Sequence, residues 1–517
     1  MEPEVLEPTQ LEPLDERQIR NAAGGFVWEL DVWGRLDRFL ILGSEDATYY
    51  ATAEEMTASG DQTIGDALAA DGLRAVARIE EISVAGRAPK NTPAIKALAV
   101  AASRGDTETR RAALRALPRV CRTGTHLFQF ASFVTTLRGW GRGLHRAVAE
   151  WYTAKSAEEA AFQMAKYRQR YGWSHRDLLR LSHPLPPTPA HRALFRWAVG
   201  KPAAGDLPVW AGLVDLLAAA ETKAEVIRLI EEYKTPWELL PTQWLGEADV
   251  RAALLPSLPL GALVRNLGRM GANGLLVPFS EASRAVCARL GDGEAIRKAR
   301  LHPVALLSVQ RVYAQGAGER GRLSWQPVPQ VIDALDGAFY AAFGAVQPSG
   351  ENVLLGVDVS GSMTIGDIAG VPGLTPNVCA AAMALVTAAV EPNYHILGFS
   401  HTLVDLGISP RMRLDDVLRR VSSLSFGGTD CALPVLWALE NGVKVEKFVV
   451  YTDNETWAGP IHVSRALETY RERTGIGAKM VKVAMTATKG TLNCPDDPRA
   501  LDVVGFDAAA PALISGF

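Results

Sequence analysis

Apolar residues recur at helical spacing through the first two thirds of the chain, from about Glu54 to Phe343. Over residues 64–82, for example, Leu, Ala, Val and Ile fall at i, i+3, i+4 and i+7. Two S-x-x-[DE] capping boxes, at Ser156 and Ser174, mark helix starts. At ordinary helix lengths this predicts roughly fourteen to eighteen helices. Since strand signals are absent there, we expect stacked helix pairs of the HEAT or armadillo kind.

The pattern changes after Gly350. Short runs rich in β-branched residues occupy residues 353–359, 394–399, 448–452, 480–485 and 503–506, and helical stretches including 378–390, 415–424 and 461–474 lie between them. Alternating buried strands and helices predict a doubly wound parallel sheet. We therefore expect a flexible arm over residues 1–20, a helical domain over 21–345 and an α/β domain over 346–517.

Composition excludes several classes of protein. With 48% apolar and 21% charged residues among 517, the chain is expected to fold rather than be disordered. No run of about 18 uncharged apolar residues occurs, so no transmembrane helix is expected. The N-terminus is acidic and Pro-rich, unlike a signal peptide. Five scattered cysteines without CxxC spacing argue against a disulfide framework or a zinc site and indicate a cytoplasmic protein.

One local motif predicts a metal site. Asp358-Val-Ser360-Gly-Ser362 directly follows the first strand of the α/β domain, where ligands bind in open sheets. A carboxylate and two hydroxyls on alternate residues suit a hard cation with oxygen ligands. Thr429 in a Gly-rich loop and Asp453 at the end of a later strand could complete the ligand set. A lone motif of this kind is as readily a capped turn, but three matching segments favour the metal site.

These five residues resemble the metal-ion-dependent adhesion site of von Willebrand A domains. The resemblance implies that the two serines and Thr429 ligate Mg²⁺, or another divalent cation. Asp358 and Asp453 are then expected to act directly or through water. An open coordination position would suit an acidic group on a protein partner. Because no His or Lys base lies within these motifs, we expect a binding site and no enzyme activity.

Positive charge is concentrated in one part of the helical domain. Residues 104–183 hold 15 Lys+Arg against 6 Asp+Glu, whereas residues 346–517 hold 13 against 18. Such a concentration is the electrostatic footprint expected for a polyanion. Helical spacing predicts one exposed face with Gln163, Lys166 and Arg170 at i, i+3 and i+7. On the next helix it predicts a second such face, formed by Arg176, Arg180 and His183.

Aromatic residues are interleaved with these charges: Trp140, Trp151, Tyr152, Tyr167, Tyr171 and Trp173. Some of them could stack on RNA bases. The alternative is a solvated face with the aromatics in the core and His183 at a helix C-terminus. Charge alone leaves the two interpretations open.

The chain as a whole resembles the Ro autoantigen (TROVE-domain) family of small-RNA-binding ribonucleoproteins. The resemblance runs from about Asp15 to the C-terminus. Its carriers include Asn21-Ala-Ala-Gly-Gly25, Lys166-Tyr-Arg-Gln-Arg170, Gly172-Trp-Ser-His-Arg-Asp-Leu-Leu-Arg-Leu-Ser-His183, Asp358-Val-Ser-Gly-Ser-Met363 and Tyr451-Thr-Asp-Asn-Glu-Thr-Trp457. Matches in order across both halves are more specific than either motif alone.

The resemblance implies a ring of HEAT-like helical repeats closed by a von Willebrand A domain. It implies Y RNA on the outer surface, with contacts from Lys166, Arg170 and His183, and ends of misfolded RNA in the central hole. It further suggests an exoribonuclease partner, which no residue here indicates. We also expect a monomer that does not bind membranes.

Three functions compete at this point. The first is a non-catalytic RNA-binding scaffold in noncoding-RNA quality control, which the basic stretch favours. The second is a metal-dependent protein-binding adaptor. The third, an RNA-processing enzyme, lacks paired carboxylates beside a His or any nucleophile–base arrangement in the sequence.

Overall fold

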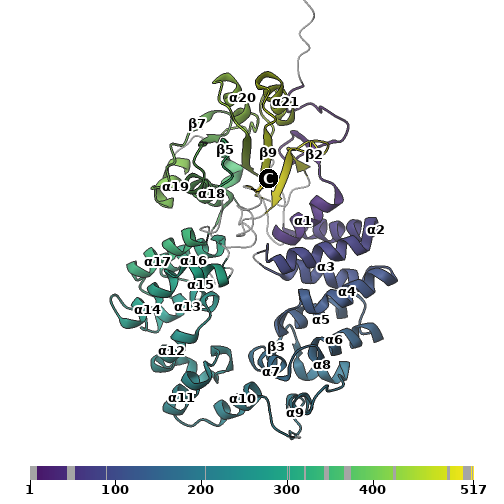
Figure 1. Cartoon of the computed structure of the whole chain (residues 1–517), viewed down its shortest axis with the longest axis vertical. Coiled ribbons are helices and arrows are strands. Elements are labelled where there is room, and N and C mark those ends of the chain that lie inside the picture. Colours follow the sequence, from purple (N-terminus) through teal and green to yellow (C-terminus); the bar gives the residue numbers. More distant parts are fainter. Residues whose placement is uncertain are drawn as a thin grey trace, which may run out of the picture.

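The computed structural model describes most of the chain: residues 8–42, 53–88, 90–203, 205–299, 301, 303–318, 322–342, 348–365, 374–422, 427–453, 455–485, 490–504, 514 and 516–517. Figure 1 shows a helical array that leaves the C-terminal domain on one side and returns to it on the other. The predicted combination of a helical ring and an α/β domain is thereby confirmed.

Seventeen α-helices form the described part of the helical half. They are α1 (Val32–Leu42), α2 (Ala53–Ala85), α3 (Thr92–Arg104), α4 (Thr107–Val120), α5 (Gly124–Leu137), α6 (Arg142–Thr153), α7 (Ala157–Lys166), α8 (His175–Ser182), α9 (Pro189–Ala198), α10 (Val209–Ala219), α11 (Lys223–Tyr233), α12 (Ala248–Leu254), α13 (Leu260–Ala272), α14 (Glu281–Leu290), α15 (Gly293–Ala299), α16 (Pro303–Gln315) and α17 (Pro329–Ala341). Short 3-10 turns, η1 (Trp237–Leu239), η2 (Thr242–Gly246) and η3 (Leu255–Ser257), join some of them.

Successive helices stack in two layers. Helix α3 contacts α2, α4 and α5, and α4 and α6 in turn contact their next-but-one neighbours α6 and α8. Amphipathic helices that each bury one apolar stripe can only be stable when stacked in this way. The buried side chains form three successive cores, around α1–α9, around α10–α12 and around α13–α17. Both predicted capping boxes, at Ser156 and Ser174, are present.

The C-terminal half contains a six-stranded sheet in the order β11-β9-β8-β5-β6-β7. Its strands are β5 (Val353–Asp358), β6 (Tyr394–Phe399), β7 (Leu403–Asp405), β8 (Lys447–Thr452), β9 (Lys479–Ala484) and β11 (Ala500–Val504). All neighbours are parallel except β6 and β7. Helices α18 (Pro376–Val390) and α19 (Leu414–Ser422) pack with one face, and α20 (Leu433–Glu440) and α21 (Val463–Thr474) with the other.

The predicted parallel strands are therefore present, with two differences. The last strand begins at Ala500 rather than at residue 503, and residues 505–506 lie outside the described part. The antiparallel edge strand β7 was not predicted, because three residues with only one partly buried side chain carry no hydrophobic pattern.

Residues 8–20 are not the free arm that the sequence suggested. Strand β1 (Gln18–Arg20) pairs with β2 (Phe26–Glu29), which pairs with β10 (Gly490–Thr491) of the C-terminal half. Gln10 is buried, and its Nε2 lies 3.3 Å from His462 Nδ1. The N-terminal segment is thus part of the C-terminal domain's packing, while residues 1–7 lie outside the described part.

The two ends of the helical array both rest on the C-terminal domain. At one end, Arg38 of α1 donates from Nη1 to the carbonyl of Gly490 at 2.7 Å. At the other end, Leu307 of α16 and Phe339 of α17 are buried in the core that α18 and the sheet share. These contacts close the ring seen in Figure 1. Within the described ranges, no helix has the length and apolar character needed to span a membrane.

Candidate functional site

The metal motif lies at the carboxyl end of β5. Asp358 is the last residue of that strand and is completely buried, and the chain then turns through the 3-10 turn η4 (Gly361–Thr364). The Ser360 N–H donates to Asp358 Oδ1 at 2.9 Å, and Ser360 Oγ lies 3.0 Å from Ser362 Oγ. The turn therefore gathers the carboxylate and both hydroxyls, as predicted from their spacing.

The other two predicted ligands come from loops that contact this turn. Asp453 directly follows β8 and accepts a hydrogen bond from the Ser362 hydroxyl. The neighbouring Thr452 Oγ1 donates to Asp358 Oδ2 at 2.7 Å. Thr429 is buried, and its carbonyl accepts from the Thr456 hydroxyl at 3.0 Å, which holds the two loops together. The structure thus brings together the segments that carry all five residues.

Burial makes this site electrostatically demanding. Burial, and secondly the charge of Asp453, raises the pKa of Asp358 to about 7. Burial also raises the pKa of Asp453. Two neighbouring acids that sequence reasoning left out behave alike, because burial raises the pKa of Asp430 to about 6 and of Glu455 to about 7. Buried carboxylates without a cation are costly, so this arrangement favours a bound cation.

The donor set fits Mg²⁺ better than a softer metal. It consists of two carboxylates and three hydroxyls, which are the hard oxygen ligands that Mg²⁺ takes. Among the described residues, no group of three or more His, Cys, Asp and Glu side chains could hold a metal. The imidazole of His401 lies against Gly427, in the loop that carries Thr429: a Cβ on Gly427 would fall 1.8 Å from His401 Nδ1. That nitrogen lies 3.4 Å from Ser400 Oγ.

The predicted basic face on α7 is not a single helical face. Helix α7 ends at Lys166, and Arg170 lies on the short strand β3 (Gln169–Arg170), which pairs with β4 (Trp173–Ser174). Lys166 is only 16% exposed in its side chain, and its Nζ lies 3.7 Å from Glu238 Oε1. The spacing i, i+7 was misleading because the helix does not continue past Lys166.

Helix α8 presents its arginines as predicted. Arg176 and Arg180 are exposed, and His183 is exposed just beyond the helix in a left-handed conformation, with φ of 45°. Over the described ranges, neither arginine forms an ion pair, and the same holds for Arg170. By contrast, Arg146 on α6 pairs with a glutamate on its own helix. We call Arg170, Arg176, Arg180 and His183 the basic surface.

The aromatic residues divide between the two interpretations that the sequence left open. Trp151 and Tyr152 are completely buried around His175, so they belong to the core. Tyr171 is 53% exposed at the tip of the β3–β4 hairpin. Positive φ at Tyr171 and at the next residue, Gly172, is typical of a two-residue hairpin turn. Only Tyr171 of these three is therefore placed to stack on an RNA base beside Arg170.

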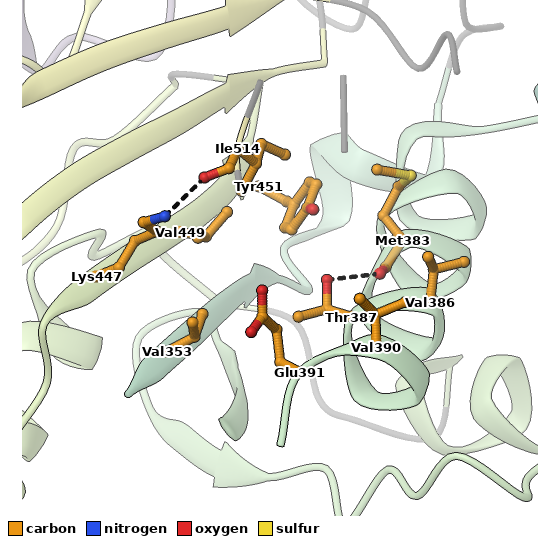
Figure 2. A pocket seen from close by; sticks show the side chains of 10 residues that line it. All are labelled: Val353, Met383, Val386, Thr387, Val390, Glu391, Lys447, Val449, Tyr451 and Ile514. Carbon is orange, nitrogen blue, oxygen red and sulfur yellow. Dashed lines mark hydrogen bonds between the residues drawn. The ribbon is translucent and has the colours of Figure 1, made fainter. Parts of the chain in front are cut away.

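The opposite end of the sheet holds a small apolar pocket (Figure 2). Lys447 lies at its edge; its Nζ donates to the carbonyl of Ile514 at 2.9 Å and pairs with Glu351 at 2.7 Å. The Glu391 carboxylate accepts from the backbone N–H of Ser349 at 2.8 Å. These charged groups hold the chain's own segments together.

Comparisons with known proteins cover the whole chain. A family model described as the TROVE domain matches residues 19–201 and 227–351, and one described as the Ro60 vWA domain matches residues 352–517. RNA-binding protein RO60 of Deinococcus radiodurans is 43% identical over 517 residues, covering 99% of this chain and 97% of that protein. RNA-binding protein RO60 of Caenorhabditis elegans is 33% identical, covering 99% and 91%.

A solved structure is similar too. The crystal structure of the Deinococcus radiodurans RO (RSR) protein matches with a TM-score of 0.72 at 42% sequence identity, covering 94% of this chain and 99% of that one. This chain therefore resembles the Deinococcus radiodurans structure in both sequence and arrangement.

Proposed function

Because this chain belongs to the Ro60 family of TROVE-domain proteins, we propose that it is a non-catalytic protein that binds Y RNA and misfolded noncoding RNA, as a scaffold in RNA quality control or processing. The observation that carries the proposal is the basic surface. Its three arginines are exposed and lack carboxylate partners in the described part of the chain. The relatives named as RNA-binding proteins support the same conclusion.

The geometry supports recognition of the RNA phosphate backbone more than recognition of the RNA base sequence. Arg176 and Arg180 lie at i, i+4 on one helix, so both guanidiniums can reach neighbouring phosphates of one RNA strand. Like charges at this spacing cost about 0.2–0.5 kcal/mol per pair in an isolated helix, and a phosphate removes that cost. Tyr171 adds an exposed ring at the edge of the same surface. An exoribonuclease partner stays a prediction from the family resemblance, and a monomeric state stays a prediction as well.

A gel-shift titration with a structured small RNA at two salt concentrations tests the proposal. We expect Arg176→Ala with Arg180→Ala to weaken binding uniformly across sequences and to lower the salt slope by about two, roughly one per phosphate contact. The matched control is Arg228→Ala with Arg465→Ala, since both residues pair with glutamates on their own helices. If the wild-type protein shows no salt-sensitive RNA binding, the proposal is overturned. If both double variants lose the same amount of RNA affinity, the basic surface is not the RNA-binding surface.

The metal site favours a second, compatible activity. Its buried carboxylates and hydroxyls suit Mg²⁺, and two carboxylates with three neutral hydroxyls would leave an open coordination position for an acidic group of a protein partner. This is the adaptor function that the sequence left as an alternative. Titration of a short acidic peptide, with and without Mg²⁺, tests it, because binding that ignores Mg²⁺ excludes recognition through the metal.

A further inference from the structure

The hairpin loop between β1 and β2, residues 21–25, lies against the segment that follows β8. We propose that this loop is an outer part of the metal site. It positions the loops that carry the metal ligands, so that docking of the hairpin and binding of a divalent cation strengthen each other. The inference rests on the proposed metal site and extends it to a segment that carries none of the predicted ligands.

Asn21 organises the hairpin loop and joins it to the C-terminal domain. Its Oδ1 accepts from the Gly25 N–H at 2.9 Å, which closes the loop on itself. Its Nδ2 donates to the carbonyl of Thr456 at 2.7 Å. The buried Glu455 carboxylate accepts from the Ala23 N–H at 3.0 Å. The hairpin loop therefore holds two adjacent residues of the segment after β8.

The same segment also holds two of the predicted metal ligands. The Glu455 N–H donates to Asp453 Oδ1 at 3.0 Å. The Thr429 carbonyl accepts from the Thr456 hydroxyl at 3.0 Å, and from the N–H groups of the next two residues at 3.1 and 3.0 Å. The segment thus has the hairpin loop on one side and both ligand loops on the other. A displacement of the hairpin loop is transmitted to the ligands through these hydrogen bonds.

Mg²⁺ is sensitive to such displacements. This cation demands near-ideal octahedral geometry, so its affinity falls when a ligand is not held in place. Residues that orient a ligand without touching the metal change metal affinity by about 10- to 100-fold when they are mutated. The hairpin loop acts one contact further out, so we expect a smaller effect of about fivefold. By linkage, the cation must strengthen docking of the hairpin by the same factor.

The hairpin also connects the metal site to the helical ring. Strand β2 ends at Glu29 and α1 begins at Val32, so the hairpin leads directly into the first helix of the ring. A cation at the metal site therefore stabilises one of the contacts through which the ring is closed.

Calorimetric titration of the full chain with Mg²⁺ tests the proposal. Asn21→Ala removes the side-chain hydrogen bonds to Gly25 and Thr456 without a change of charge, and we expect about fivefold weaker Mg²⁺ binding. Asn91→Ala is the matched control in the helical half. Its Nδ2 donates to the carbonyl of Val120 at 2.9 Å, and its Oδ1 accepts from the Ser83 hydroxyl at 2.7 Å. This variant loses similar hydrogen bonds and should keep the wild-type Mg²⁺ affinity.

Hydrogen–deuterium exchange of the wild-type protein is a second measurement that needs no variant. Saturating Mg²⁺ should slow the exchange of backbone amides in residues 21–26 by about fivefold, because local opening of the hairpin then requires loss of the tighter metal-bound state. The amides of α11, which lies in the helical half, should exchange at the same rate with and without Mg²⁺.

The outcomes separate this inference from the proposed metal site. If wild-type protein binds no Mg²⁺, the metal site is wrong and this inference fails with it. If wild type binds Mg²⁺ and Asn21→Ala binds it equally tightly, or Asn91→Ala loses as much affinity, only the role of the hairpin loop is overturned. Exchange in residues 21–26 that ignores saturating Mg²⁺ would overturn that role as well.

Discussion

His175 shows how far neighbouring residues can differ in environment. It lies between Ser174 and the exposed Arg176, yet it is 4% exposed. Its Nδ1 lies 2.7 Å from the Tyr152 hydroxyl, and its ring stacks near Trp151. Burial lowers the pKa of His175 to about 3 and, on α5, that of His126 to about 4. Both imidazoles are therefore neutral in the folded protein.

These histidines predict a loss of stability in mild acid. Because both folded pKa values lie below the unfolded value of about 6.5, protons bind the unfolded state first, and stability is lost as pH falls below 6.5. At pH 5, His175 alone should lower the free energy of unfolding by about 2 kcal/mol relative to its value at neutral pH. Urea unfolding at pH 7.5 and 5.0 measures this. His175→Gln should lower stability at pH 7.5 but lose less between the two pH values; an identical pH dependence would contradict the assignment.

Local spacing predicted the placement of some candidate site residues and misplaced that of others. Asp358, Ser360 and Ser362 are predictable because one tight turn fixes all three side chains. Lys166 and Arg170 are not, since helical counting assumes that the helix continues, and the chain instead enters the β3–β4 hairpin. Asp430 could have been noticed, because it directly follows Thr429, but its burial depends on packing between loops.

At the scale of elements, the loops after β5 and β8 should respond to Mg²⁺. We expect Mg²⁺ to stabilise wild-type protein, by about 2.7 kcal/mol at a hundred times its dissociation constant, because it binds only the folded loops. Asp358→Asn keeps the size of the side chain but removes a buried charge close to Asp453. The metal-free variant should therefore melt above metal-free wild type and show no response to Mg²⁺. Thermal melts with and without EDTA check both the higher melting temperature of the metal-free variant and its lack of response to Mg²⁺.

A different outcome would be informative about this site. A variant that melts lower and still responds to Mg²⁺ would exclude Asp358 as a ligand. RNA titrations of the same two proteins should agree, since the basic surface lies on the helical half. Loss of RNA affinity in Asp358→Asn would mean that the two halves are coupled.

The N-terminal loop depends on a glycine. A Cβ at Gly25 would fall 2.0 Å from the carbonyl of Thr456, and the Asn21 amide donates to that same carbonyl at 2.7 Å. Gly25→Ala should therefore push the loop off the C-terminal domain and destabilise the protein by about 1–3 kcal/mol. Gly212→Ala is the control, because nothing lies within 4 Å of its Cβ. Chemical denaturation that gives the same midpoint for both variants would show that the loop can move without cost.

Elements were predictable where the signal was local. Buried parallel strands such as β5 and β8 can be recognised in the sequence as runs of β-branched residues. The pairing of β2 with β10 could not be recognised, because β10 has only two residues and the two strands lie at opposite ends of the chain. The contact of residues 8–20 with the C-terminal domain was missed for the same reason.

At the scale of the whole molecule, a buried polar cluster joins the two halves. Lys482 of β9 is fully buried, and its Nζ lies 2.6 Å from Asp502 Oδ1 and from Thr491 Oγ1. Burial, and secondly the charge of Arg38, lowers the pKa of Lys482 to about 7. The charged side chains of α1, β9 and β11 and the Thr491 hydroxyl of β10 thus meet at one junction.

Removing one partner should weaken that junction strongly. Lys482→Ala leaves the partly buried Asp502 without its closest cation, at a cost of up to about 3–5 kcal/mol. Calorimetry should show the C-terminal domain melting earlier than in wild type. Lys444→Ala, an exposed lysine of the same domain, should leave the melting profile unchanged. Equal melting of all three proteins would show that the cluster contributes nothing to stability.

Ring closure through distant segments also sets when this protein can finish folding. Arg38 and Gly490 are 452 positions apart, so β2 and α1 leave the ribosome long before their partners exist. At about 5–20 residues per second, that interval lasts roughly 20 to 90 s. During translation, the edge of β2 that later pairs with β10 is exposed to solvent. The Arg38 side chain, which is buried in the finished fold, is also exposed at that stage. The nascent chain is therefore most prone to pair with other chains in this period, and its final closure is a post-translational event.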